Sequence, residues 1–462
     1  MKKTSILFLA VLTSASIATM AQAPAKSVIA SKPAAQTVAS KTSAPALKSQ
    51  ADILKSLSSE SRACVECHQK GATPVVVQQW ATSRHAQNAI GCYESHQADK
   101  SRPDAFEHYG QLISLLVTPK NCGVCHDKET QEFEGSYHAR AGEILGSLDN
   151  VLGELVEGPP AANSGCRQCH GGTIKVLAGG RLDATTWPNE GIGRLNPDGS
   201  KGSCTACHSR HTFSASIARQ PENCGKCHLG PDHPQAEIYA ESKHGITYRA
   251  KINEMNLDNP TWVLGKDYNA APTCATCHMS ATKDLPLTHD VGTRISWTLR
   301  PEVSVKLENW EKRRGDMQKV CSNCHAKEWI GNFYKQYDAV VDLYNTKFGA
   351  PAKGIMKKLR DAGKLTPTPF DEKIEWTYYE LWHHQGRRAR MGAAMMGPDY
   401  TQWHGFYEVA KSFYTEFLPE AEALLPGVTA EVRAMDDNKW LQGLSKEDRE
   451  KIQQYYQKRY GE

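Results

Sequence analysis

The chain has 462 residues, of which 23% are charged and 40% hydrophobic, a composition that excludes a collagen-like or mostly disordered protein. Its 55 basic and 51 acidic residues leave a formal net charge of +4, which gives no electrostatic case for binding nucleic acid. The unusual counts are 15 cysteines and 18 histidines, and because 15 is odd, a framework in which every cysteine forms a disulfide is excluded.

The N-terminus predicts export. Lys2 and Lys3 precede an apolar run over residues 6–12, and a stretch of small residues then ends at Ala23. This order of charge, apolar run and small residues is typical of a secretory signal peptide, which we place at residues 1–23. The apolar run is too short to anchor the chain across a membrane. We therefore expect the protein in the periplasm or an equivalent extracytoplasmic compartment.

The segment after the signal peptide, residues 24–50, predicts a disordered linker. It consists mainly of Ala, Ser, Lys, Pro and Thr, with few large apolar side chains. Such a composition cannot bury enough apolar surface to offset the entropy lost on ordering. No later segment offers about 18 consecutive uncharged apolar residues, so no membrane span is expected.

Seven copies of the pattern Cys-x-x-Cys-His follow along the chain. They are Cys64/Cys67/His68, Cys122/Cys125/His126, Cys166/Cys169/His170, Cys204/Cys207/His208, Cys224/Cys227/His228, Cys274/Cys277/His278 and Cys321/Cys324/His325. An eighth unit, second in chain order, is Cys92-Tyr93-Glu94-Ser95-His96, in which serine replaces the second cysteine.

This spacing is what covalent haem attachment requires. Two thiols three residues apart add to the two vinyl groups of one haem, and the histidine that follows binds the iron. A zinc ribbon needs pairs of cysteines but no histidine after each pair. We predict eight c-type haems, the second of which is attached through one thioether at Cys92 with His96 as ligand. Loss of that haem is the alternative at this position.

Ten further histidines lie outside the units. They are His85, His108, His138, His211, His233, His244, His289, His383, His384 and His404. A haem that only carries electrons usually takes a second axial ligand, which closes the iron to substrate. Eight closed haems would need eight such ligands, so counting leaves open whether one iron is accessible. Because His383 and His384 are adjacent, we expect only one of them to bind iron.

A candidate proton-transfer pair follows the sixth unit. Asp232 and His233 come within five residues of His228, ahead of a helical stretch. A neighbouring carboxylate and imidazole can shuttle protons for a substrate bound to iron. The alternative interpretation is an ion pair in an exposed loop.

The chain changes character after His325. Residues 51–325 form the predicted haem-binding catalytic region, where segments are short and rich in Gly, Pro, Asn and Asp, so that the haems supply most of the core. Residues 326–462 form a predicted helical region for packing and oligomerisation. Its two apolar stripes are Ile330, Phe333, Tyr337, Val340 and Tyr344, and Trp403, Phe406, Ala410, Phe413 and Phe417. These spacings of three and four predict helices, the second interrupted at Pro419, with residues 350–370 as a loop between them.

The order and spacing of the units resemble the octahaem hydroxylamine oxidoreductase family over most of residues 60–417. The segments that carry the resemblance are Cys64-Val65-Glu66-Cys67-His68, Ser83-Arg84-His85, Ser209-Arg210-His211-Thr212-Phe213-Ser214, Asp232-His233, Ser242-Lys243-His244-Gly245, Ala271-Pro272-Thr273-Cys274, Thr288-His289-Asp290 and Pro398-Asp399-Tyr400-Thr401-Gln402-Trp403. The family implies a mainly α multihaem cytochrome c, with a haem-packed N-terminal region and long C-terminal helices that assemble a homotrimer or a higher oligomer.

The resemblance also implies residue roles. The fourth haem, on Cys166, Cys169 and His170, would be catalytic, with no protein ligand on its distal side. Asp232 and His233 match the acid–base pair above that iron. Tyr400 matches the tyrosine that reaches from a neighbouring subunit in oxidative members and bonds to the catalytic haem. The distal ligands of the other seven haems would be His85, His108, His138, His211, His244, His289 and one of His383 and His384, for which we take His384.

The main functional prediction is hydroxylamine oxidation, with electrons passing through seven bis-histidine haems to a redox partner such as a cytochrome c. Nitrite reduction without the tyrosine cross-link is a second possibility. A cation at Arg300, near where the family has an active-site tyrosine, would favour such an anionic substrate. A third is a pure electron carrier with every iron closed, in which His233 or His404 would be the eighth distal ligand.

Overall fold

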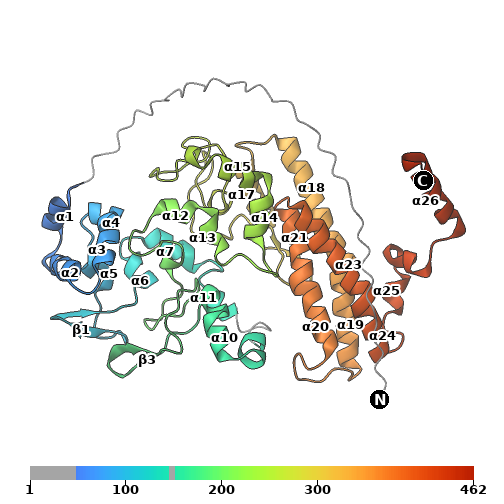
Figure 1. Cartoon of the computed structure of the whole chain (residues 1–462), viewed down its shortest axis with the longest axis horizontal. Helices are drawn as coiled ribbons and strands as arrows, with labels where there is room; N and C mark the ends of the chain where they lie inside the picture. Colours follow the sequence, from blue (N-terminus) through green and yellow to red (C-terminus); the bar gives the residue numbers. More distant parts are fainter. Residues whose placement is uncertain (1–47, 145–150, 462) are drawn as a thin grey trace, which may run out of the picture. The chain divides into compact units, whose positions relative to one another are not determined.

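The computed structural model describes residues 48–144 and 151–461 (Figure 1). The predicted signal peptide at residues 1–23 and the predicted linker up to residue 47 lie outside the described residues. Across the described ranges helices dominate and the few strands are very short. The predicted mainly α fold is confirmed.

The haem-binding region consists of short helices joined by loops. Its helices are α1 (Gln50–Ser56), α2 (Ser59–Lys70), α3 (Pro74–Ala81), α4 (Arg84–Gln87), α5 (Cys92–His96), α6 (Pro119–Gly123), α7 (Asp127–Glu134), α8 (Ala141–Ile144), α10 (Pro159–Ser164), α11 (Cys166–His170), α12 (Ala215–Arg219), α13 (Pro221–Gly225), α14 (Gln235–Glu241), α15 (Lys243–Ala250), α16 (Cys274–His278) and α17 (Trp310–Cys321). Three of them, α5, α11 and α16, are themselves cysteine–histidine units, because the spacing closes within little more than one helical turn.

Three small antiparallel pairs of strands and several single turns complete this region. The strands are β1 (Phe106–His108) with β2 (Gln111–Ile113), β3 (Val176–Leu177) with β4 (Arg181–Leu182), and β5 (Trp297–Thr298) with β6 (Val305–Lys306). The turns are η1 (Val151–Val156), η2 (Ala178–Gly180), η3 (Cys204–Ala206) and η4 (Ile252–Glu254). In the first pair, Phe106 lies opposite Ile113.

The C-terminal region consists of longer, nearly continuous helices. They are α18 (Lys327–Tyr344), η5 (Asn345–Gly349), α19 (Ala350–Asp361), α20 (Lys373–Tyr379), η6 (Glu380–Gly386), α21 (Arg387–Ala394), α22 (Pro398–Thr401), η7 (Gln402–Tyr407), α23 (Glu408–Ser412), η8 (Phe413–Phe417), α24 (Leu418–Leu424), α25 (Ala430–Ala434), η9 (Asp436–Gln442) and α26 (Lys446–Tyr460). The helices α19, α20, α23 and α24, together with η5, η6, η8 and the end of α18, share one apolar core, and most of α18 packs in a second cluster with Trp297 (Figure 1). In the described residues no helix has the length and apolar character needed to cross a membrane.

We predicted a loop over residues 350–370, but the first half of this range is helix α19. Pro351 lies in the first helical turn, where its missing N–H costs nothing, and Gly354 has open space around it. The helix buries Ala352, Ile355, Met356 and Leu359. It ends before Gly363, whose φ of +64° suits glycine.

The predicted interruption at Pro419 is also wrong. Helix α24 begins at Leu418 directly after η8, so Pro419 stands in a first turn. In the apolar stripe that precedes Pro419, Phe413 and Phe417 are fully buried, whereas Trp403 at the start of the stripe is 61% exposed. The stripe on α18 packs as predicted at Ile330, Tyr337 and Tyr344.

Truncation of Phe417 should strongly destabilise the protein. Its ring contacts those of Phe413 and Tyr378 at 6.0 and 5.9 Å between centroids, and no part of it is exposed. We expect Phe417→Ala to lower the free energy of unfolding by about 3–5 kcal/mol, measured by chemical denaturation of the holoprotein. Tyr455→Ala serves as the control and should cost far less, because Tyr455 is 54% exposed on α26, a helix without a buried residue. Equal effects of the two substitutions would contradict the packing described.

Candidate functional site

The cysteines of the units are all available for covalent attachment. All fifteen lie in the part of the chain that the structure describes, and no two of them are joined in a disulfide. The described residues therefore exclude a disulfide framework, in agreement with the odd count. Thiols that form no disulfide, in units that each end in a histidine, fit haem attachment.

Three of the predicted haem-binding cysteines are exposed, namely Cys67, Cys125 and Cys324. The other twelve are partly buried. Cys125 and Cys324 come just after the ends of α6 and α17, in turns that the helices do not cover.

The exposure of the third thiol, Cys67, has a different cause. Cys67 follows the buried Val65 by two residues on α2, which turns its side chain to the opposite face of the helix. In all three units the first cysteine, which is Cys64, Cys122 or Cys321, is partly buried. Exposure leaves each second thiol accessible for a thioether, so these three residues remain predicted attachment points.

Five unit histidines face a histidine predicted as a distal ligand. The pairs, with the distances between ring centroids, are His68–His108 (6.1 Å), His126–His85 (6.2 Å), His208–His289 (6.5 Å), His228–His138 (6.1 Å) and His325–His244 (6.1 Å). Two imidazoles on opposite sides of one metal ion have centroids about 6 Å apart, because each metal–nitrogen bond is about 2 Å. The side chains present thus fit five haems, each held between two histidines.

Burial keeps these imidazoles in the form that binds metal. Desolvation lowers the pKa of His138 to about 4 and that of His228 to about 3. The same cause lowers the pKa of His208 to about 4. A neutral imidazole is the form that binds a metal ion, so these side chains need no deprotonation at neutral pH.

The other predicted ligands that the structure describes, among them His96, His211 and His384, have different surroundings. The His96 ring donates from Nδ1 to the carbonyl oxygen of Ser114 at 2.8 Å and lies near His211, whose pKa burial lowers to about 4. His384 pairs with the carboxylate of Glu380 at 2.9 Å rather than with a unit histidine. Its neighbour His383 is buried and stacks on the ring of Tyr379 at 4.2 Å. Among the described residues the partner of the His384 ring is thus Glu380.

Neighbouring units pack against one another through their cysteines. Three pairs of thiols lie close enough to shift one another's pKa, namely Cys122–Cys204, Cys169–Cys227 and Cys224–Cys274, and Cys169 Sγ lies 3.9 Å from the carbonyl oxygen of Lys226. The three pairs join the third unit to the fifth, the fourth to the sixth, and the sixth to the seventh. The fourth unit, predicted to be catalytic, thus adjoins the sixth.

The predicted acid–base pair is formed, and it lies beside the sixth unit. His233 donates from Nδ1 to Asp232 Oδ1 at 2.5 Å and from Nε2 to the carbonyl oxygen of Cys227 at 2.8 Å. Burial opposes a charge on His233, but the hydrogen bond and charge of Asp232 outweigh burial and raise the pKa of His233. Because both ring nitrogens face oxygen acceptors, this geometry favours the imidazolium form of His233, in which both nitrogens donate.

Asp232 has a second cationic partner that the sequence did not indicate. Arg387 Nη1 binds Asp232 Oδ2 at 3.2 Å, and Arg387 Nε donates to the carbonyl oxygen of Arg300 at 2.8 Å. The guanidinium also lies over the ring of Trp382 at 5.2 Å, and Arg387 is only 9% exposed. Burial opposes a charge on Asp232, but His233, His383 and Arg387 together hold the pKa of this carboxyl below its ordinary value.

Further arginine side chains gather near His138. The guanidinium groups of Arg300 and Arg140 lie 4.9 and 5.3 Å from the ring centroid of Tyr137, the residue before His138. The positive charge of Arg300 also helps to lower the pKa of His138, after burial. This side of the site is therefore cationic.

Tyr400 lies on α22, where its ring is 5.4 Å from that of His404. Burial and the nearby carboxylates of Glu237 and Glu241 raise the pKa of Tyr400. His404 itself is exposed and pairs with Asp399 and Glu408. Within one chain the structure thus places both side chains among carboxylates, and brings neither to Asp232 and His233.

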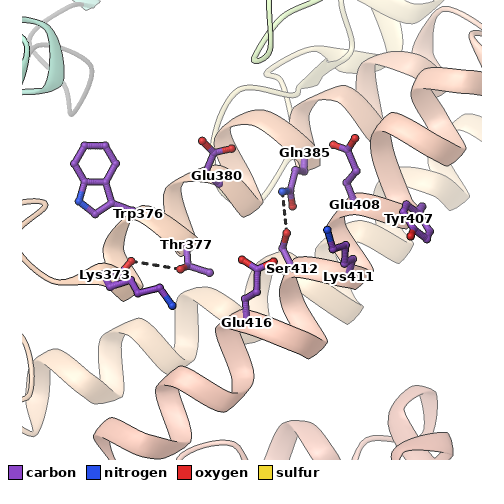
Figure 2. Close-up of a pocket in the computed structure, with 10 residues that line it drawn as sticks. All are labelled: Lys373, Trp376, Thr377, Glu380, Gln385, Tyr407, Glu408, Lys411, Ser412 and Glu416. Atoms are coloured by element: carbon purple, nitrogen blue, oxygen red, sulfur yellow. Dashed lines mark hydrogen bonds between the residues drawn. The ribbon is translucent and has the colours of Figure 1, made fainter. Parts of the chain in front are cut away.

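A pocket of about 500 Å³ lies elsewhere, between α20, η6 and α23 (Figure 2). Its lining includes Glu380, Glu408 and Lys411, and Gln385 donates to Ser412 across it at 2.9 Å. No cysteine of a unit and no predicted catalytic residue lines it. We therefore do not regard it as the substrate site.

The chain is similar in sequence to known proteins. Residues 198–370 match the family described as "Seven times multi-haem cytochrome CxxCH". A "Probable nitrite reductase-hydroxylamine oxidoreductase fusion protein" of Kuenenia stuttgartiensis is 27% identical over 369 residues, which is 66% of this chain and 38% of that protein. The chain thus spans well under half the length of this relative.

Two solved structures are similar over most of the chain. A "Hypothetical multiheme protein" superposes with a TM-score of 0.72 at 26% identity, over 84% of this chain and all of that one. The "Kuenenia stuttgartiensis reducing HAO-like protein complex Kustc0457/Kustc0458" has a TM-score of 0.59 at 22% identity, over 81% of this chain and 87% of that one, and shows the fold. These matches confirm the predicted resemblance to the hydroxylamine oxidoreductase family, and residues 198–370 match a family of multihaem cytochromes whose Cys-x-x-Cys-His pattern indicates covalently bound c-type haems.

Proposed function

We propose that the protein is an oxidoreductase of small nitrogen compounds and that it oxidises hydroxylamine. The observation that carries the proposal is the Asp232–His233 pair, formed beside the sixth unit, which in turn adjoins the fourth. When bound, the haem held by Cys166, Cys169 and His170 would offer an open iron to substrate, and the other haems would carry electrons to a redox partner such as a cytochrome c. The similarity to a probable nitrite reductase–hydroxylamine oxidoreductase fusion protein supports this class of reaction.

The contribution of the chain's own residues is to hold and move protons. His233 is anchored by its backbone acceptor at Cys227 and by Asp232, so its ring keeps one orientation. Arg387 holds the second oxygen of Asp232, which fixes the carboxylate against rotation. A proton taken from hydroxylamine can be accepted by His233 once it has passed its own proton on, and a positioned imidazole typically contributes about 10²- to 10⁴-fold to rate.

We propose nitrite reduction as a second candidate function, because two features of the site favour it. Both ring nitrogens of His233 face oxygen acceptors, which favours the protonated ring that can donate a proton, as reduction of nitrite requires. Arg300 and Arg140 supply positive charge near His138, which suits an anion better than neutral hydroxylamine.

Arg300→Gln separates these two functions. If nitrite is the substrate, the substitution should raise the KM for nitrite roughly tenfold with little change in kcat, because it weakens attraction of the anion. The KM for hydroxylamine should remain the same. The measurement is steady-state kinetics with each substrate, nitrite with a reduced viologen dye and hydroxylamine with oxidised cytochrome c. Equal effects on both substrates would contradict a role for Arg300 in selecting an anion.

We also propose an exported homotrimer, or a higher assembly, in which Tyr400 of a partner copy reaches the fourth haem. Trp403 and Tyr407 lie one and two helical turns beyond Tyr400 and are 61% and 52% exposed, which offers an aromatic surface for a second copy. If Tyr400 is cross-linked, the reduced protein should show an absorption band to the red of ordinary haem c. Tyr400→Phe should then remove the band. A spectrum without it in the unaltered protein would favour nitrite reduction.

A further inference from the structure

The second unit offers its haem fewer covalent bonds than the other units do. Because Ser95 stands where other units have a cysteine, only Cys92 can form a thioether. A haem held by two thioethers is fixed at two points, whereas a single bond leaves it free to rotate about that bond. The peptide that supplies Cys92 and His96 must then be held in place by other contacts. This inference rests on the haem attachments proposed above and does not depend on the substrate.

Glu94 holds this peptide in place. Its Oε1 accepts a hydrogen bond from Ser58 Oγ at 2.7 Å, and its Oε2 accepts from Ser61 Oγ at 2.6 Å. Oε2 also accepts from the backbone N–H of Gly91 at 2.8 Å. One carboxylate thus joins the N-terminus of α5 to the N-terminus of α2, more than 30 residues earlier in the chain. Hydrogen bonds to an ionised carboxylate are stronger than neutral ones.

The contact between the two helices is close on both sides of Glu94. Ser61 is fully buried, and its Oγ also accepts from the backbone N–H of Tyr93 at 2.9 Å. A Cβ at Gly91 would lie 2.4 Å from the Cβ and Oγ of Ser61, so only glycine permits this approach. The backbone of α5 therefore rests directly on Ser61.

The partner helix α2 carries the first unit. Cys92 packs against the small apolar cluster that includes Val65 and Trp80, and Val65 lies between the two cysteines of the first unit. At the other end of α5, the carbonyl oxygen of Ser114 accepts from Nδ1 of His96, which leaves Nε2 for a metal ion. Glu94 thus stands between the two groups that would hold the second haem.

We propose that Glu94 takes the mechanical role of the missing thioether: its carboxylate clamps α5 onto α2 and so holds Cys92 and His96 in the geometry that keeps the second haem bound by two histidines. Glu94 acts through these residues and is a positioning residue. The geometry also gives a reason why serine is tolerated at position 95.

The test uses Glu94→Gln, Ser95→Cys and the double variant, with Glu60→Gln as the matched control. Glu60 is on α2, the helix to which Glu94 binds, but its carboxylate accepts a hydrogen bond from the adjacent Ser59. The readouts are the covalent haem count from the mass of the denatured chain and the number of nitric oxide molecules that the reduced protein binds. Neither requires turnover.

We expect Glu94→Gln to raise nitric oxide binding by one per chain or to lower the covalent count by one. Ser95→Cys in the Glu94→Gln background should restore the original values by adding a second thioether, and Glu60→Gln should leave both values unchanged. Unaltered binding and count in Glu94→Gln would overturn the proposal. Failure of Ser95→Cys to rescue would also overturn it, since Glu94 would then serve the packing of α5 alone. A count of seven in the unaltered protein would show that Cys92 carries no haem and would overturn it as well, while leaving the fourth unit and the proposed activity untouched.

Discussion

Replacing Asp232 by asparagine should lower kcat/KM at least about 100-fold, because the substitution removes the charge that keeps His233 protonated and oriented. Asparagine keeps the shape of the side chain but cannot act as the anionic partner of both His233 and Arg387. The measurement is steady-state kinetics with hydroxylamine, and with nitrite if that proves to be the substrate. Asp232 does not belong to a unit, so the haem spectrum should remain the same.

Asp436→Asn is the matched control for this experiment. Asp436 is exposed on η9 and pairs only with Lys439 among the described residues, so the same change of charge there should leave kcat/KM within about twofold. A loss of less than tenfold in Asp232→Asn, with the control unchanged, would contradict the role given to the pair.

Removal of His138 should open a second iron to ligands. Its ring faces that of His228 at 6.1 Å, as expected for two histidines on one iron. We expect His138→Gly to raise nitric oxide binding by the reduced protein from one to two per chain, and added imidazole to reverse the change. No change in binding would show that another group closes the iron of the sixth unit.

His404→Ala serves as the control for His138→Gly and also tests the idea of a pure electron carrier. His404 is exposed between Asp399 and Glu408, so its loss should leave nitric oxide binding at one per chain. A gain of one in this variant would instead identify His404 as a distal ligand.

The haem attachments could be predicted from the sequence because the chemistry fixes the spacing within each unit. The spacing does not determine how far each thiol is enclosed, and the exposure of Cys125 and Cys324 depends on where the preceding helices end. Five distal histidines could be assigned through the family resemblance, and the structure brings each of them to a unit histidine.

The choice between His383 and His384 could not be made from the sequence. Adjacent residues on a helix point in directions about 100° apart, and only packing decides between them. The structure places His383 inside the core and His384 against Glu380.

Arg387 could not have been identified from sequence, because it lies 155 residues from Asp232 and its role depends on tertiary packing. Helix α19 was missed for a different reason. Pro351 and Gly354 lower helix propensity, but the first occupies a position that tolerates proline, and burial of residues such as Ile355 outweighs the second. The apolar stripe was expected to pack on other helices or on a partner subunit, and periodicity alone does not show that Phe413 and Phe417 are buried within the chain whereas Trp403 is exposed.

The most direct test of the central claim is the number of nitric oxide molecules that the fully reduced protein binds, measured by optical titration. A chain with seven irons closed by two histidines each and an open iron at the fourth unit should bind one per chain. Binding of none would show that every iron is closed, which would contradict both proposed activities and leave electron transfer as the function.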